Sequence, residues 1–184
     1  MLIMFALLAV IAVIAFWLIG AYNGLVRLKN QVKNAWAQID VQLKRRHDLI
    51  PNLVETVKGY AGHEKTTLEN VVKARGAAVQ AQGPQEQGKA EGMLSSALGR
   101  LMVVVEQYPD LKANQNFLAL QEELTSTENK IGFSRQHYND SVMTYNTRTE
   151  SFPVNVIAGM FGFKGEEFFE LEDEAAREAP KVAF

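Results

Sequence analysis

The sequence contains no cysteine among its 184 residues. Disulfide bonds, thiolate zinc sites, cysteine nucleophiles and a cysteine-linked lipid anchor are therefore all excluded. The sequence also lacks an excess of either charge, because 19 basic residues nearly balance 21 acidic ones and the formal net charge is −2. No global basic field draws the chain to nucleic acid, so we expect no nucleic-acid partner.

Charged and strongly polar side chains are absent from residues 1–21, MLIMFALLAVIAVIAFWLIGA. About 20 apolar residues in a helix that rises about 1.5 Å per residue cross the hydrocarbon core of a bilayer. Trp17 and Tyr22 lie near the end of this run, where amphipathic rings favour the headgroup layer. The alternative is a cleaved signal peptide, but the run is longer than a usual signal core and lacks a basic start. We therefore expect a retained transmembrane helix, with the lipid bilayer as a partner.

The rest of the chain shows helical spacing of apolar residues and no strand-like alternation. The stripe from Tyr22 to Ala61 keeps its phase across Pro51, which predicts one long kinked helix, with a break at Pro51 as the alternative. Further helices are predicted over residues 64–81, 91–107 and 111–151. The segment 82–92, QGPQEQGKAEG, is polar and rich in glycine, and it predicts a flexible connection.

The last of these helices has an apolar residue at every seventh position, which is typical of left-handed bundle packing. These positions are Phe117, Leu124, Ile131, Tyr138, Tyr145 and Phe152. We predict an all-α protein, in which an N-terminal transmembrane helix precedes an elongated up-and-down bundle of about four long antiparallel helices.

Three segments follow from this prediction: a transmembrane helix over 1–21, a helical bundle over 22–152, and a C-terminal tail over 153–184. The tail has a short apolar cluster, from Val156 to Phe163, followed by an acidic stretch. The cluster has two interpretations. It packs against an open end of the bundle, or its exposed aromatic side chains contact a membrane surface or a partner.

The run Lys44-Arg45-Arg46-His47-Asp48 is the most unusual part of the predicted bundle. Basic runs often bind lipid headgroups or nucleic acid, but consecutive helical residues point to all faces of a helix. Arg46 or His47 must lie near the apolar stripe, so we expect one of them to be paired inside the bundle. A buried charge without a partner costs several kcal/mol. The candidate partners on the last long helix are Glu128, Asn129, Asn139 and Asp140.

Recognisable catalytic motifs are missing. His63-Glu64 begins like a zinc-protease motif, but the second histidine that the motif requires is replaced by Thr67. His47 and His137 have no second ligand at helical spacing, and no nucleophile elbow or phosphate-binding loop occurs. The sequence therefore predicts no catalytic residue, no metal site and no cofactor.

Several long strings resemble the LemA family. They are YNGLVRLKNQVKNAWAQIDVQLKRRHDLIPNLVETVKGYAGHE, YPDLKANQNFLALQEELTSTENKI, YNDSVMTYNT, FP and FGF, in that order. The resemblance covers essentially the whole chain. It implies a single-pass inner-membrane protein with a helical-bundle domain. The family includes a relative involved in magnetosome membrane formation, so the resemblance also implies a membrane-organising role.

These observations predict a membrane-anchored, non-catalytic scaffold or adaptor that organises protein or lipid at the bacterial inner membrane. Gly20 and Gly24 form a small-xxx-small pair, which lets helix backbones approach closely and predicts a homo-oligomer. Other membrane proteins are further candidate partners. The alternatives are an accessory subunit of a membrane protease or envelope complex, and a metal-dependent hydrolase that uses the histidines and carboxylates.

Orientation follows from the charges beside the predicted span. Arg27, Lys29 and Lys33 come shortly after it, and no basic side chain precedes it. Because basic residues near a span are retained on the cytoplasmic side, we expect the N-terminus outside and the bundle in the cytoplasm.

Overall fold

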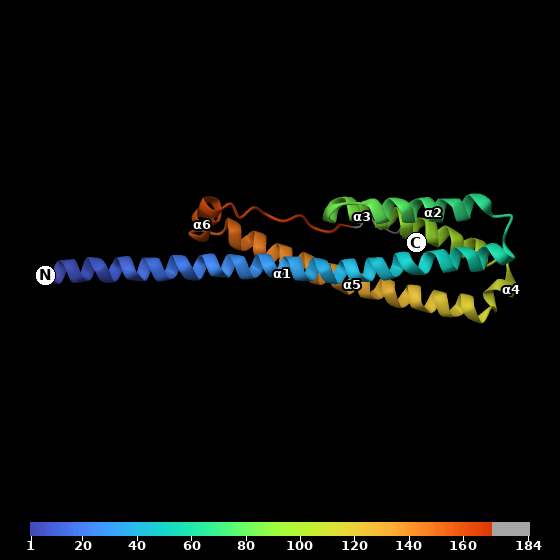
Figure 1. The fold of residues 1–184 in the computed structure, drawn as a ribbon, viewed down its shortest axis with the longest axis horizontal. Coiled ribbons are helices and arrows are strands. Elements are labelled where there is room, and N and C mark those ends of the chain that lie inside the picture. Colours follow the sequence, from blue (N-terminus) through green and yellow to red (C-terminus); the bar gives the residue numbers. More distant parts are fainter. Residues whose placement is uncertain (171–184) are drawn as a thin grey trace, which may run out of the picture. The chain divides into compact units, whose positions relative to one another are not determined.

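The computed structural model describes residues 1–170, which form helices and no strand. The helices are α1 (Leu2–Tyr60), α2 (Lys65–Gln80), α3 (Gly83–Val105), α4 (Pro109–Lys112), α5 (Gln115–Glu150) and α6 (Val154–Phe161), as Figure 1 shows. The predicted all-α fold, with a long apolar N-terminal helix followed by bundle packing, is confirmed. Most of the acidic stretch predicted for the tail lies outside the described residues.

The chain divides into two compact units. The first consists of Met1–Gln38 and Gln136–Glu167, and the second of Ile39–Arg135 together with the described residues 168–170. Helices α1 and α5 each contribute residues to both units.

The second unit has an apolar core to which five helices contribute. Its fully buried residues include Ile50, Leu53 and Val57 of α1, Val71 of α2, Leu94 and Leu101 of α3, Leu111 of α4, and Phe117 of α5. Helices α2 and α3 run side by side in this unit (Figure 1). Burying one large apolar side chain contributes about 1.5–3 kcal/mol, so this core is the main favourable term in the folding of the unit.

Helix α1 runs without interruption through Pro51, so the prediction of one long helix is confirmed. Ile50 and Leu53 are fully buried and Pro51 itself is exposed, which places the ring outside the core. Proline cannot donate to the carbonyl four residues earlier, here that of His47. The Arg75 side chain of α2 supplies the missing donor, because its Nε donates to the His47 carbonyl oxygen at 2.7 Å.

The predicted flexible connection over 82–92 is wrong, because α3 begins at Gly83 and continues through it. Pro84 lies in the first turn, where its missing N–H costs nothing. The Glu86 carboxylate accepts a hydrogen bond from the Gln82 backbone N–H at 3.1 Å, which satisfies a donor just before the helix. Pro84 and the Glu86 contact therefore favour the start of a helix in a segment that has few apolar residues.

Gly88, in the middle of that segment, serves close packing. A methyl group at this position would overlap the carbonyl oxygen of Glu170, so only glycine lets the Glu170 backbone lie against α3. The Phe169 side chain is fully buried in the same unit. The glycine content that suggested a flexible segment therefore reflects a close approach of two backbones.

The helix predicted over 111–151 is divided into α4 and α5. The Asn114 side chain caps α5, because its Oδ1 accepts hydrogen bonds from the backbone N–H groups of Asn116 and Phe117, at 2.9 and 3.1 Å. Most of the predicted heptad positions are buried or half-buried. Phe152 is the exception, with 83% of its surface exposed, because α5 ends at Glu150 and the heptad spacing does not extend past it.

The first unit contains the N-terminal part of α1. Residues 1–20 are exposed throughout, and α1 is the one helix within residues 1–170 that is long and apolar enough to cross a membrane. Helix α6 packs beside the end of this apolar run. A small core joins Val154, Ile157 and Ala158 of α6 to Ala21 and Leu25 of α1.

The chain after α6 is fastened to α5 by polar contacts. The Asn146 side-chain amide exchanges two hydrogen bonds with the backbone of Glu166, each 2.9 Å long. The Tyr138 hydroxyl donates to the Glu167 carbonyl oxygen at 2.8 Å. Burial, with the nearby charges of Glu166 and Glu167, raises the pKa of Tyr138 to about 12, so the hydroxyl remains a donor at neutral pH.

We expect Pro51→Ala to be tolerated. The new N–H can donate to the His47 carbonyl oxygen alongside Arg75, and α1 already passes through the site. Thermal unfolding of the full chain in detergent measures the effect, and the melting temperature should stay within a few degrees or rise. A fall of more than about 10 °C, a loss on the order of 2 kcal/mol or more, would contradict this account.

Candidate functional site

The basic run of α1 spreads over all faces of the helix. Lys44 and Asp48 lie on an exposed face and form an ion pair one helical turn apart, at 3.6 Å. Arg45 is half-exposed and pairs with Glu123 of α5. These charges do not converge on one patch. The run as a whole therefore does not form a single surface for lipid headgroups or nucleic acid.

Arg46 and His47 point into the second unit, where they are 4% and 7% exposed. Both reach the carboxylate of Glu91 on α3, which is fully buried. Arg46 Nη1 donates to Glu91 Oε2 at 3.0 Å, and His47 Nε2 lies 2.6 Å from Glu91 Oε1. A buried carboxylate thus meets two neighbouring donors from α1.

Further polar groups complete this arrangement. Gln87 Nε2 donates to Glu91 Oε1 and to the Ala78 carbonyl oxygen, each at 3.0 Å. Arg46 Nη2 lies 2.8 Å from Ser95 Oγ and 3.0 Å from Glu128 Oε2 of α5. We call Arg46, His47, Gln87 and Glu91 the Glu91 cluster. Through it, polar contacts join α1, α2, α3 and α5.

Electrostatics explains why these residues must occur together. Removing a carboxylate from water costs several kcal/mol, and close opposite charge with additional hydrogen bonds offsets that cost. Glu91 receives contacts from Arg46, His47 and Gln87 on its two oxygens. Loss of any one donor leaves a buried charge with incomplete compensation. The cluster therefore constrains how α1 and α3 can be rotated against each other.

The four partners expected for Arg46 or His47 lie in different surroundings. Glu128 reaches Arg46 in the second unit. Asn129 and Asp140 are exposed, and Asn139 is half-buried in the first unit. An added Cβ at Gly20 or Gly24 would meet no atom within 4 Å, so both glycines leave open space beside the helix.

Sequence reasoning missed the roles of Gln87, Gly88 and Glu91. Gln87 and Gly88 lie in the segment 82–92 that the sequence predicts to be a connection, and Glu91 lies where this segment overlaps the start of the helix predicted over 91–107. One signal could have found Gln87 and Glu91. The buried Leu94 and Leu98 of α3 continue backward at helical spacing to Glu91, Ala90 and Gln87, so the same face carries on with polar residues.

A groove of about 330 Å³ opens beside the cluster, and its lining includes Lys44, His47, Asp48, Arg75 and Gln87. A histidine held by a carboxylate is a pairing that general bases use, so this groove is where acid–base chemistry would occur. The described part of the chain holds no group of three or more His, Asp or Glu side chains that could bind a metal ion.

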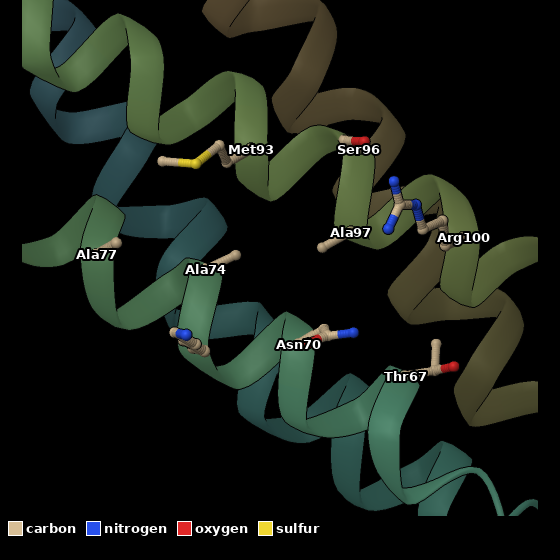
Figure 2. Close-up of a pocket in the computed structure, with 9 residues that line it drawn as sticks. Thr67, Asn70, Ala74, Ala77, Met93, Ser96, Ala97 and Arg100 are labelled. Carbon is tan, nitrogen blue, oxygen red and sulfur yellow. The ribbon is translucent and has the colours of Figure 1, made fainter.

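A second groove, of about 410 Å³, lies between α2 and α3 in the same unit. Figure 2 shows Ala74 and Ala77 of α2 across from Met93 and Ala97 of α3. The charged residues in its lining are both basic, Lys73 and Arg100. This groove has no acid–base pair, so it offers less for chemistry than the groove beside His47.

These features define an all-helical protein, in which an N-terminal helix long and apolar enough to cross a membrane continues into a bundle that buries a charge cluster. The chain belongs to the LemA family, whose model matches residues 35–184.

Similar proteins include MamQ 1 of Paramagnetospirillum magneticum, a magnetosome protein, at 29% identity over 95% of this chain and 74% of the relative. The magnetosome protein MamQ of Magnetospirillum gryphiswaldense is 27% identical over 88% of this chain and 70% of the relative. Protein LemA of Metamycoplasma hominis is 29% identical over 80% of this chain and 68% of the relative.

We expect Glu91→Leu to lower the free energy of unfolding by about 3–5 kcal/mol, because it leaves Arg46 buried without its main counter-charge. The double variant Arg46→Met with Glu91→Leu should recover much of this loss, since it removes both charges. Chemical denaturation of the full chain in detergent, followed by circular dichroism, measures both changes.

The matched control is Glu123→Gln, which breaks the half-exposed pair with Arg45. Its expected cost is about 0–1 kcal/mol, because exposed ion pairs contribute little. If Glu91→Leu costs no more than this control, the cluster does not stabilise the fold as described.

Proposed function

We propose that this protein is a membrane-anchored scaffold or adaptor that organises protein or lipid at the bacterial inner membrane. The observation that carries the proposal is that the residues of the Glu91 cluster are bound to one another. Arg46 and His47, the side chains best suited to chemistry, are engaged with Glu91 in contacts between helices. The cluster gives the bundle a fixed shape, which a scaffold requires.

The relatives support the same proposal. The chain belongs to the LemA family, and similar chains carry the name of magnetosome proteins. Crosslinking in native membranes, followed by affinity purification of the full chain, tests the proposal. A scaffold should yield crosslinks to itself and to other membrane proteins. If efficient crosslinking yields the chain with no crosslink to a second copy or to another protein, the proposal is rejected.

A hydrolase is the second candidate function, and one observation favours it. His47 is paired with Glu91 and also lines the 330 Å³ groove. Metal analysis of the purified full chain separates the two functions at low cost. Stoichiometric zinc or manganese would favour the hydrolase and count against the scaffold.

We expect the chain to self-associate through its span, and Gly20→Leu with Gly24→Leu to weaken the assembly. Leucine would block close approach of two helices, while the open space beside both glycines accepts it in a single chain. Native mass spectrometry of mildly solubilised protein measures the oligomer. The control variant is Gly76→Leu with Gly99→Leu, two helical glycines of the bundle that also have open space. A uniform monomer in the unaltered protein would sink this prediction.

We expect the bundle to face the cytoplasm, because Arg27, Lys29 and Lys33 follow the span. Reporter fusions after Phe184 test this orientation. A fluorescent-protein fusion should be bright and an alkaline-phosphatase fusion inactive, whereas the opposite pair of results would reverse the topology.

A further inference from the structure

Helix α6 has two apolar faces, and one of them is covered. Val154, Ile157 and Ala158 are buried against Ala21 and Leu25 of α1. Aromatic contacts reinforce this packing, because the Tyr22 ring lies 4.9 Å from the ring of Phe161 and 5.6 Å from that of Phe163. α6 is therefore fastened to the turns of α1 where the predicted span ends.

The other face of α6 is exposed and still apolar. Val156 is 55% exposed, Met160 is 75% exposed, and Phe152 just before the helix is 83% exposed. No residue from Phe152 to Phe163 is charged. A helix that faces water normally carries charged residues on its outer side, so an outer face of this composition points to a covering surface.

The position of α6 indicates what that surface is. Its partners Ala21 and Leu25 lie at the end of the apolar run that we expect to cross the bilayer, and a bilayer around that run would have its headgroups at the level of α6. Polar groups begin directly afterwards in the same unit. Lys29 Nζ lies 3.9 Å from Glu166 Oε1 and 5.9 Å from the Phe163 ring centre. Arg27 and Lys33 are exposed nearby in sequence, as anionic headgroups favour.

We propose that α6 is an interfacial helix whose outer face, Phe152, Val156 and Met160, enters the headgroup layer of the bilayer that the span crosses. The span then has a second, adjacent membrane contact. Amphipathic helices with bulky apolar residues on one side lie in this layer, with the apolar face at the acyl boundary. The inference rests on the span being in a bilayer, which belongs to the proposed function.

A single-cysteine experiment tests the proposal without background, because the chain has no native cysteine. Met160→Cys and Val156→Cys each carry a spin label in the full chain, reconstituted in nanodiscs of phosphatidylcholine and phosphatidylglycerol. Collision with oxygen, which concentrates in lipid, is compared with collision with a water-soluble nickel complex. The ratio of oxygen to nickel collision should be several-fold higher at both positions than at Thr144→Cys, an exposed residue of α5 in the same unit.

Two results would overturn the proposal. Nickel collision at Met160→Cys as frequent as at Thr144→Cys would place α6 in water. Protection from both reagents, with dipolar broadening that disappears on dilution with unlabelled chain, would show that a second copy covers this face. A label at Ile11→Cys reports on the span alone. Lipid exposure at Ile11→Cys with water exposure at Met160→Cys would reject the interfacial helix and leave the anchor intact.

Discussion

The buried carboxylate of Glu91 is the constraint that organises the second unit. A charge in this position is tolerated because α1 supplies Arg46 and His47 side by side, and α3 itself supplies Gln87. Apolar side chains tolerate small rotations of a helix, whereas a carboxylate that needs three donors tolerates few. Buried pairs of this kind are weak sources of stability compared with apolar packing. What the cluster contributes is one defined arrangement of the helices around it.

The same turn of α1 explains how a proline is accommodated. Pro51 leaves the His47 carbonyl oxygen without its helical donor, and Arg75 of α2 supplies a replacement. His47 therefore uses its side chain to bind α3 and its backbone to bind α2. Arg46, the residue before it, extends to Glu128 of α5. Within the second unit, one turn of α1 makes polar contacts with α2, α3 and α5. Because Pro51 has no backbone N–H to donate to the His47 carbonyl oxygen, this oxygen is free to accept from Arg75.

The sequence predicted the helices whose buried side chains are apolar, and it failed where the buried side chains are polar. Apolar spacing located α1, α2 and most of α5, including the passage through Pro51. Helical geometry also indicated that Arg46 or His47 must lie inside. It did not locate the first turns of α3, because their buried face consists of Gln87 and Glu91, which look like solvent-facing residues. Nor could spacing show that Phe152, a heptad position, lies beyond the end of α5 and is exposed. Partner identity requires the fold, since Arg46 and Glu91 are far apart in sequence.

Apolar periodicity also has a different meaning in each part of α1. Before Ala21 the apolar side chains are exposed, which suits lipid. At Ala21 and Leu25 they pack against α6, and from Ile50 to Val57 they enter the core of the second unit. The pattern of residues is similar in all three stretches, so sequence alone cannot assign the solvent. The eight residues of α6 also include apolar side chains whose surroundings cannot be assigned from sequence. One of its faces packs against α1, and the other resembles the apolar N-terminal run in composition. The proposed bilayer contact would cover that second face without an additional protein partner.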